Sequence, residues 1–505
     1  MLTARGHGYP AQDIIVVPSP SDFSALFPTP QGLIENDWPP AQITYLGTYL
    51  THLGCKTLVI ENHYVDRDYI SDVALFYSRS LRGYPNFCQR VHFFRESFDL
   101  ERWKQLTVDL NGGKNKGSQP FLQDAYLGFC VVRPLPGSPI GRTVLKTVAR
   151  ITQSGDVREF GAVREYLVHL GGFELAVDGL AFQQQDQGVS ACATTALWSA
   201  MHAVARKEAL AIPTPADITQ AASRYVLASG RSLPSEGLNI QQICEATRAA
   251  GLEPLVMRSV SLAQDRAQLL SYVSSGFAPV LAIQTMQGMG HAVCAVGVKL
   301  GKTQPQSNPE LHFRDNASAV SSIYIHDDRL GPYASADLYG YTQTPDKIRT
   351  ALRIRWPRTD NEVEHAILDA MIVPVPAKLR LTVTRMRELG LALAETAGQI
   401  FSQFNRGVGL NTRYFKGTDY RKAAVDFGLS NDGLYKLLCQ VALSRYIGVV
   451  EISVPDGPLF DVLLDATETR ANPAALACLR RSLLPSGAEE KLGAIANRFG
   501  AKLIV

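Results

Sequence analysis

One cysteine in the middle of the chain stands where a nucleophile could work. Cys192 follows a polar, glutamine-rich stretch, FQQQDQGVSA (182–191), and opens a segment in which apolar residues recur three, four and seven positions after Leu197. We therefore expect Cys192 in the first turn of a helix, where the helix dipole and unpaired backbone N–H groups favour a thiolate, the nucleophilic form of cysteine. A small cysteine packed at a buried helix start is the alternative interpretation.

A histidine further along the chain is a candidate base for that thiol. His291 follows Gly290 and opens HAVCAVGVKL (291–300), an apolar stretch typical of a buried strand. An imidazole at the mouth of such a strand can face a helix terminus, take the thiol proton and return it to a leaving amine. The alternative is a strand-edge histidine whose ring caps a loop.

A carboxylate that would orient the imidazole is expected at the end of the next strand, SSIYIHDD (321–328). Asp327 there could accept the imidazole N–H and fix its tautomer, the role of the third group in a catalytic triad. Two acids before a Gly-Pro pair also suit a simple turn. His326 is a competing base, but neighbouring side chains alternate across a strand, so only one of His326 and Asp327 can face the site.

The order of these segments resembles the papain-like cysteine peptidases, specifically the branch that processes bacteriocin leaders (double-glycine peptidases). The resemblance rests on FQQQD, ACATTAL, GHAVCAVG and IYIHDD, and on the helix and strand pieces at 238–252 and 262–283. It covers about residues 178–375, less than half of the chain. It implies an α+β fold whose papain-like core packs a Cys-led helix on an antiparallel sheet.

The resemblance also implies roles for the candidate residues. Cys192 would be the nucleophile, His291 the general base and acid, and Asp327 the orienting carboxylate. The pattern does not separate Asp327 from Asp328, and Asn316, in a long stretch between His291 and Asp327, is a distant substitute.

A glutamine of this family donates a side-chain N–H to the oxyanion, beside the backbone N–H of the cysteine. Two residues compete for that role. Gln185 lies seven residues before Cys192, and Gln187 lies five before it. Gln185 is slightly favoured because it ends the strand-like FQQQ.

The function expected from this set is a thiol hydrolase, a cysteine peptidase that cleaves a peptide or isopeptide bond of a protein or peptide substrate through a thioester. An acyl transferase of the transglutaminase type or a glutamine deamidase would use the same residues, because a fold does not settle a reaction. A catalytically inactive peptidase-like module that binds a partner is the non-enzymatic alternative.

The amino-acid composition bears on the partners, cofactors and location that we expect for the protein. The chain of 505 residues is 46% hydrophobic, and 50 Lys and Arg against 47 Asp and Glu leave a net charge of +3, too small to indicate a nucleic-acid partner. Eight cysteines without a CxxC pair argue against a disulfide framework and a zinc ribbon, and without HExxH we expect no metal and no organic cofactor. No apolar run of about 20 residues and no signal peptide are visible, so we expect no membrane partner and a cytoplasmic location. The oligomeric state stays open.

The chain is expected to form three domains. Residues 1–140 form an N-terminal α/β domain without a phosphate loop, 141–375 the peptidase domain, and 376–505 a helical, then strand-containing, C-terminal α/β domain that starts near the junction Pro374–Pro376. The flanking elements we expect are strands at 13–18, 56–61, 126–133, 447–453, 460–465 and 501–505, helices at 41–53, 379–404 and 420–443, and a loop at 114–119.

Overall fold

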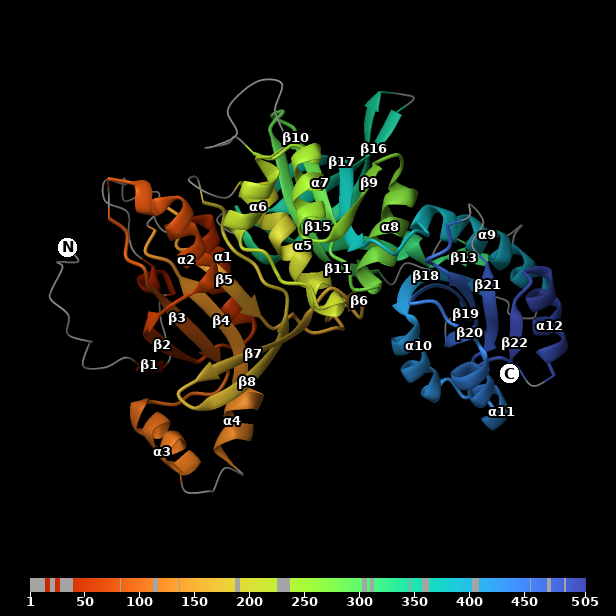
Figure 1. Cartoon of the computed structure of the whole chain (residues 1–505), viewed down its shortest axis with the longest axis horizontal. Coiled ribbons are helices and arrows are strands. Elements are labelled where there is room, and N and C mark those ends of the chain that lie inside the picture. Colours follow the sequence, from red (N-terminus) through yellow and green to blue (C-terminus); the bar gives the residue numbers. More distant parts are fainter. Residues whose placement is uncertain are drawn as a thin grey trace.

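The computed structural model describes residues 14–18, 23–27, 40–81, 83–111, 117–135, 137–186, 191–224, 237–301, 307–308, 313–344, 347–356, 363–401, 408–454, 456–469, 474–485 and 487–505. In Figure 1 three groups of strands with their helices follow one another along the longest axis, from the N-terminal group (orange) through the middle group (green) to the C-terminal group (blue). The predicted α+β class is confirmed, because helices surround sheets that are mainly antiparallel.

The first sheet is antiparallel throughout. It contains, in spatial order, β1 (Ile14–Pro18), β2 (Thr57–Tyr64), β3 (Cys88–Phe94), β4 (Tyr126–Val132) and β5 (Ile140–Leu145). Its helices are α1 (Ala41–His52), α2 (Arg67–Leu75), α3 (Leu100–Asn111) and α4 (Ser118–Ala125), with 3₁₀ turns at Phe23–Leu26 and Tyr77–Arg79. Every residue of β4 is buried, as its continuous apolar sequence predicts. A separate hairpin of β7 (Arg164–Leu170) and β8 (Phe173–Gly179) follows.

The middle sheet closes on itself. Strand β10 pairs with both β11 and β17, so β10, β11, β14, β15, β16 and β17 form a ring filled by apolar side chains, while β9 pairs with β17 and β6 with β11. The strands are β6 (Val157–Glu159), β9 (Leu252–Arg258), β10 (Val280–Thr285), β11 (Gly290–Leu300), β14 (Val320–Asp327), β15 (Gly331–Thr344), β16 (Lys347–Arg355) and β17 (Val363–Pro376). The helices are α5 (Cys192–Glu208), α6 (Pro215–Ala222), α7 (Ile240–Ala249) and α8 (Leu262–Ser274), with a 3₁₀ turn at Asn316–Ala319.

Helix α5 lies against the outside of this ring. Its apolar face, which includes Leu197, Trp198 and Met201, is fully buried, and the helix contacts β11, β10, β14 and β17. The packing fixes the direction of the helix, so its first residue lies near the ends of those strands.

The last sheet takes two strands from the middle of the chain. Its order is β12 (Ser307–Asn308), β13 (Phe313–Asp315), β18 (Val408–Lys416), β19 (Tyr446–Val454), β20 (Gly457–Asp465), β21 (Ala475–Arg480) and β22 (Lys502–Ile504). The pairs β13–β18 and β21–β22 are parallel, and the others are antiparallel. Its helices are α9 (Val383–Ile400), α10 (Gly417–Ala423), α11 (Asn431–Tyr435) and α12 (Glu489–Arg498), with a 3₁₀ turn at Ala424–Asp426 and a π turn at Lys436–Gln440. The stretch between His291 and Asp327 thus adds an edge to a sheet built mostly from residues after 408.

Most of the flanking elements lie where the sequence predicts them, but the single helix expected at 420–443 is wrong. The chain there forms α10, α11 and two short turns. Gly428 takes a positive φ of 73°, which ends one helical segment, and the Ser430 side chain caps the start of the next. Of the loop expected at 114–119, residues 114–116 lie outside the described part of the chain, and Ser118 and Gln119 begin α4.

Across the described part of the chain, every helix is too short or too polar to span a lipid bilayer.

Replacing Gly128 by alanine should destabilise the first sheet. A Cβ at Gly128 would lie 2.0 Å from the carbonyl oxygen of Val144, and its φ of 126° disfavours any side chain. We expect a loss of about 2–4 kcal/mol in the free energy of local unfolding, measured as faster hydrogen exchange in β4 and β5. Gly83 is the matched control, because a Cβ there meets no atom within 4 Å. Equal exchange in the Gly128→Ala and Gly83→Ala proteins would contradict the prediction.

Candidate active site

Cys192 is the first residue of α5 and is half-buried, with a free thiol. The carbonyl of Ala191 accepts hydrogen bonds from the backbone N–H groups of Thr194, at 2.9 Å, and Thr195, at 3.2 Å. The first hydrogen-bonded turn of the helix therefore begins at Ala191, the residue before the cysteine. The expected position of Cys192 at a helix start is confirmed. The sulfur is therefore held at the N-terminal end of a helix whose other face is anchored in the core.

His291 is the second residue of β11 and directly follows a tight hairpin turn. Ile283 of β10 is its register partner, and the turn is closed by a hydrogen bond of 2.9 Å from the Thr285 N–H to the Met289 carbonyl. Gly288 supplies the positive φ of 84° that this turn requires. The expected strand start at His291 is confirmed, and its ring is buried, with 6% of the side chain exposed.

Asp327 ends β14, whose antiparallel pairing with β11 brings its last residues beside His291. The His291 Nε2 and the Asp327 Oδ1 are 2.9 Å apart, and the Asp327 side chain is fully buried. The Cys192 side chain lies close enough to His291 to raise the pKa of its imidazole. Because Nε2 is occupied by Asp327, Nδ1 is the ring nitrogen left for the sulfur. The structure thus brings Cys192, His291 and Asp327 together.

Charges around the imidazole favour its protonated form. Burial is the largest influence and by itself lowers the pKa of His291. It is outweighed by the Asp327 carboxylate, by hydrogen bonds to Asp327 and Cys192 and by Asp328, which together raise the pKa to about 10. At neutral pH the ring is therefore an imidazolium between a sulfur and a carboxylate. Burial raises the pKa of Asp327, but His291 and Arg329 outweigh this and hold it below its usual range.

Arg329 holds the orienting carboxylate in place. Its backbone N–H and Nε donate to Asp327 Oδ1, at 3.0 and 3.3 Å, and its Nη2 donates to Oδ2, at 3.1 Å. Its Nη1 reaches both carboxylate oxygens of Glu364, at 3.0 and 3.1 Å. Neither Arg329 nor Glu364 was predicted from the sequence. An arginine two residues after a strand-ending aspartate was the available signal for the first, whereas Glu364 comes from a distant strand.

Asp328 lies near the His291–Asp327 pair but makes different contacts from Asp327. Its Oδ1 is 3.8 Å from His291 Nε2, its side chain is almost fully buried, and among the described residues neither of its oxygens has a hydrogen-bond partner. Burial is the main reason that the pKa of Asp328 is raised to about 7; Asp327 adds to it, and His291 opposes it. Of the two aspartates that the sequence pattern left open, Asp327 is the one bonded to the imidazole.

His326 faces away from this site. Its ring makes edge contacts with Phe182 and Tyr333, with centroids 5.6 and 4.9 Å away, and burial lowers its pKa to about 3. A neutral, fully buried ring between aromatic groups is not placed to serve as the base. Asn316 is also elsewhere: it donates to Asn411, at 3.1 Å, and to Ser453, at 3.4 Å, in the last sheet.

The glutamine-rich segment before Cys192 is anchored to β5. Phe182 forms a bridge with Thr143, and the backbone of Gln184 bonds to Ile140 and to the Arg133 side chain. Gln185 is half-buried, and Gln187 lies outside the described residues. Gln183, two residues before Gln185, is buried, and its Nε2 has no hydrogen-bond partner among the described residues. Gln183 was not among the predicted site residues, although side chains two residues apart share a face of an extended segment.

The carboxylates and imidazole also form a group that could hold a metal ion. One ligand atom from each of His291, Asp327 and Asp328 lies within 4.8 Å of the others. However, the imidazole and Asp327 are bonded to each other, and the Arg329 guanidinium already contacts both Asp327 oxygens. A cation bound here would meet that positive charge, so the arrangement fits proton transfer better than metal binding.

Comparison of the chain with protein-family models and with curated protein sequences found no match. The side chains that could do chemistry at this site are a sulfur at a helix start, an imidazole whose pKa is raised, and a buried carboxylate fixed by an arginine.

Proposed function

We propose that the chain is a thiol hydrolase, most specifically a cysteine peptidase with a papain-like core at residues 141–375. The observation that carries the proposal is the hydrogen bond from His291 to the buried Asp327 carboxylate, with the Cys192 side chain near enough to the same imidazole to raise its pKa. Three side chains from a helix start, a strand start and a strand end meet in one place. This is the arrangement that nucleophilic acyl transfer requires.

In the proposed reaction the thiolate form of Cys192 attacks the carbonyl carbon of the scissile bond beside the His291 imidazolium. The backbone N–H groups at the start of α5, with Gln185 as the additional donor, stabilise the negative oxygen that forms. His291 then gives its proton to the leaving amine, and a thioester of Cys192 remains. His291 next takes a proton from water, which attacks the thioester and releases the acid.

Asp327 and Arg329 act on the orientation of the base. The carboxylate fixes the imidazole so that Nδ1 faces the sulfur, and Arg329 prevents the carboxylate from turning. The regions 1–140 and 376–505 are proposed as flanking domains that determine which protein or peptide substrate reaches Cys192.

Cys192 should react with iodoacetamide faster than the more exposed Cys439 at pH 6–7, because only a thiolate is nucleophilic. Peptide mass spectrometry of a time course measures the two rates in one sample. In the His291→Ala protein, the Cys192 rate should fall at least about tenfold while the Cys439 rate is unchanged. If Cys192 reacts no faster than Cys439, the proposed catalytic role is wrong.

A small activated ester tests acyl transfer directly. p-Nitrophenyl acetate should acetylate Cys192 in a burst, followed by slower turnover, whereas Cys192→Ala should show neither and should keep its melting temperature. Cys439→Ala is the matched control and should behave as the unmodified protein. Unfolding of the Cys192→Ala protein would instead assign the residue to the core.

The two aspartates should differ in their effects. Asp327→Asn should lower the acetylation rate about 10²- to 10⁴-fold at neutral pH, because the imidazole loses the group that orients it. Asp328→Asn should keep most of that rate but move the alkaline limb of its pH profile. The His291 imidazolium persists below a pKa of about 10 and is lost above it, so removing the Asp328 charge lowers that limit. A large loss in Asp328→Asn with a normal Asp327→Asn would exchange the two roles.

A further inference from the structure

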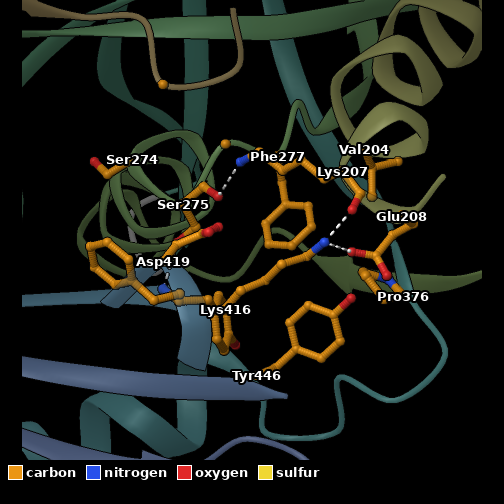
Figure 2. A pocket seen from close by; sticks show the side chains of 14 residues that line it. Val204, Lys207, Glu208, Ser274, Ser275, Phe277, Pro376, Lys416, Asp419 and Tyr446 are labelled. Carbon is orange, nitrogen blue, oxygen red and sulfur yellow. Dashed lines mark hydrogen bonds and ion pairs between the residues drawn. The ribbon is translucent and has the colours of Figure 1, made fainter. Parts of the chain in front are cut away.

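A cavity of about 200 Å³ lies between the middle ring and the last sheet, at the opposite end of α5 from Cys192. Its walls come from the last turn of α5, from the end of α8 with the loop into β10, from Pro376 at the end of β17, and from β18, α10 and β19 (Figure 2). Cavities at the boundary between packed units are preferred places for small ligands.

Two of the four charged side chains on the wall neutralise each other. The Glu208 carboxylate accepts from Lys416 Nζ, at 2.9 Å, and from Arg445 Nη2, at 2.8 Å. Lys416 also donates to the backbone carbonyl of Lys207, so its ammonium is fully engaged, as the dashed lines in Figure 2 show. These ion pairs join α5 to the last sheet, and they occupy both oxygens of the Glu208 carboxylate.

The other two charged groups on the wall are one ammonium and one carboxylate. Lys207 Nζ donates to the Ser275 carbonyl at 3.3 Å, and neither Lys207 nor Asp419 forms an ion pair with any described residue. The Lys207 ammonium lies directly over Gly276. A Cβ at Gly276 would overlap Lys207 Nζ, so the ammonium can take this position only because Gly276 has no side chain. Both Lys207 and Asp419 are exposed to solvent. Partial desolvation and the neighbouring Arg164 lower the pKa of Lys207, whereas Asp419 raises it, so the two charges lie within electrostatic reach of each other.

The rest of the wall is largely apolar and aromatic. The rings of Phe277 and Tyr446 lie on either side of the Lys416 stem in Figure 2. Val204, Tyr414 and Phe415 also line the cavity, together with Gly161, Ser274, Ser275 and Pro376. A dry apolar cavity of about 150 Å³ is enough for benzene. The space here therefore fits a branched alkyl group together with two small charged groups.

We propose that this cavity binds a free apolar α-amino acid of the size of leucine, with its carboxylate on Lys207 and its ammonium on Asp419. A zwitterion matches the one cation and one anion that have no ion-pair partner, and the alkyl group would contact Phe277 and Tyr446. Binding would add contacts between α5 and the last sheet, so it would stabilise the folded chain according to the ligand concentration. The proposal does not depend on the chemistry at Cys192.

Isothermal titration of the full chain with L-leucine tests the site. We expect saturable binding with a Kd of about 1 mM. 4-Methylpentanoate, which lacks the ammonium, and 3-methylbutylamine, which lacks the carboxylate, should each bind at least about tenfold more weakly, because each leaves one charged group of the protein without a partner.

Variants of the wall separate this site from weak binding elsewhere. Lys207→Gln and Asp419→Asn should each weaken L-leucine binding at least about tenfold, while Lys422→Gln, on the exposed face of α10, should not. Lys207→Arg keeps the positive charge and should retain most of the affinity for L-leucine. If Lys207→Gln does not fold, the Lys207→Arg protein still tests whether a positive charge at this position is sufficient for binding. Absence of saturable binding, equal affinity for either analogue, or unchanged affinity in Lys207→Gln would each overturn the proposal.

Discussion

The buried charge of Asp327 is the constraint on which the arrangement of the site depends. An ionised carboxylate without exposure is costly unless charged partners and hydrogen bonds satisfy it, and here His291 takes one oxygen while Arg329 contacts both. Arg329 is in turn paired with Glu364. The signs alternate along Glu364, Arg329, Asp327 and His291, so each charge stabilises its neighbours. Removing Arg329 would leave Glu364 without this ion pair and Asp327 with His291 alone, and this ties the geometry of the imidazole to side chains well away from the sulfur.

The register of the strands places His291 and Asp327 next to each other. The antiparallel pairing of β11 with β14 brings the start of one strand beside the end of the other, and Ile283 in β10 fixes His291 from the opposite edge. A slip of one residue along β14 would exchange the faces of His326 and Asp327. The aromatic contacts of His326 with Phe182 and Tyr333 oppose such a slip. The pairing of β14 with β15 is irregular between Ile325 and Asp327, where strand pairing gives way to the turn that contains Arg329.

Local patterns explain which features the sequence predicted. The helix that begins at Cys192, the strand that begins near His291 and the strand that ends at Asp327 each have an apolar period and a boundary readable within about ten residues. Part of what escaped prediction is non-local. Glu364 reaches the site through sheet pairing, and residues 307–315 join the last sheet through contacts with residues after 408. The break in the helix expected at 420–443 was local but was overlooked, since Gly428 and Ser430 are ordinary end and start signals.

Helix α5 links the proposed site to the last sheet. With 17 residues it is about 25 Å long, with Cys192 at its first position and Glu208 at its last. Its middle is packed against the ring of strands, and its last turn is held by the ion pairs of Glu208 with Lys416 and Arg445 and by the bond from Lys416 to the Lys207 carbonyl. A helix is stiff along its axis, so sliding Cys192 away from His291 would also have to break these contacts. Residues after 376 therefore contribute to the distance between the sulfur and the imidazole through their contacts with the last turn of α5.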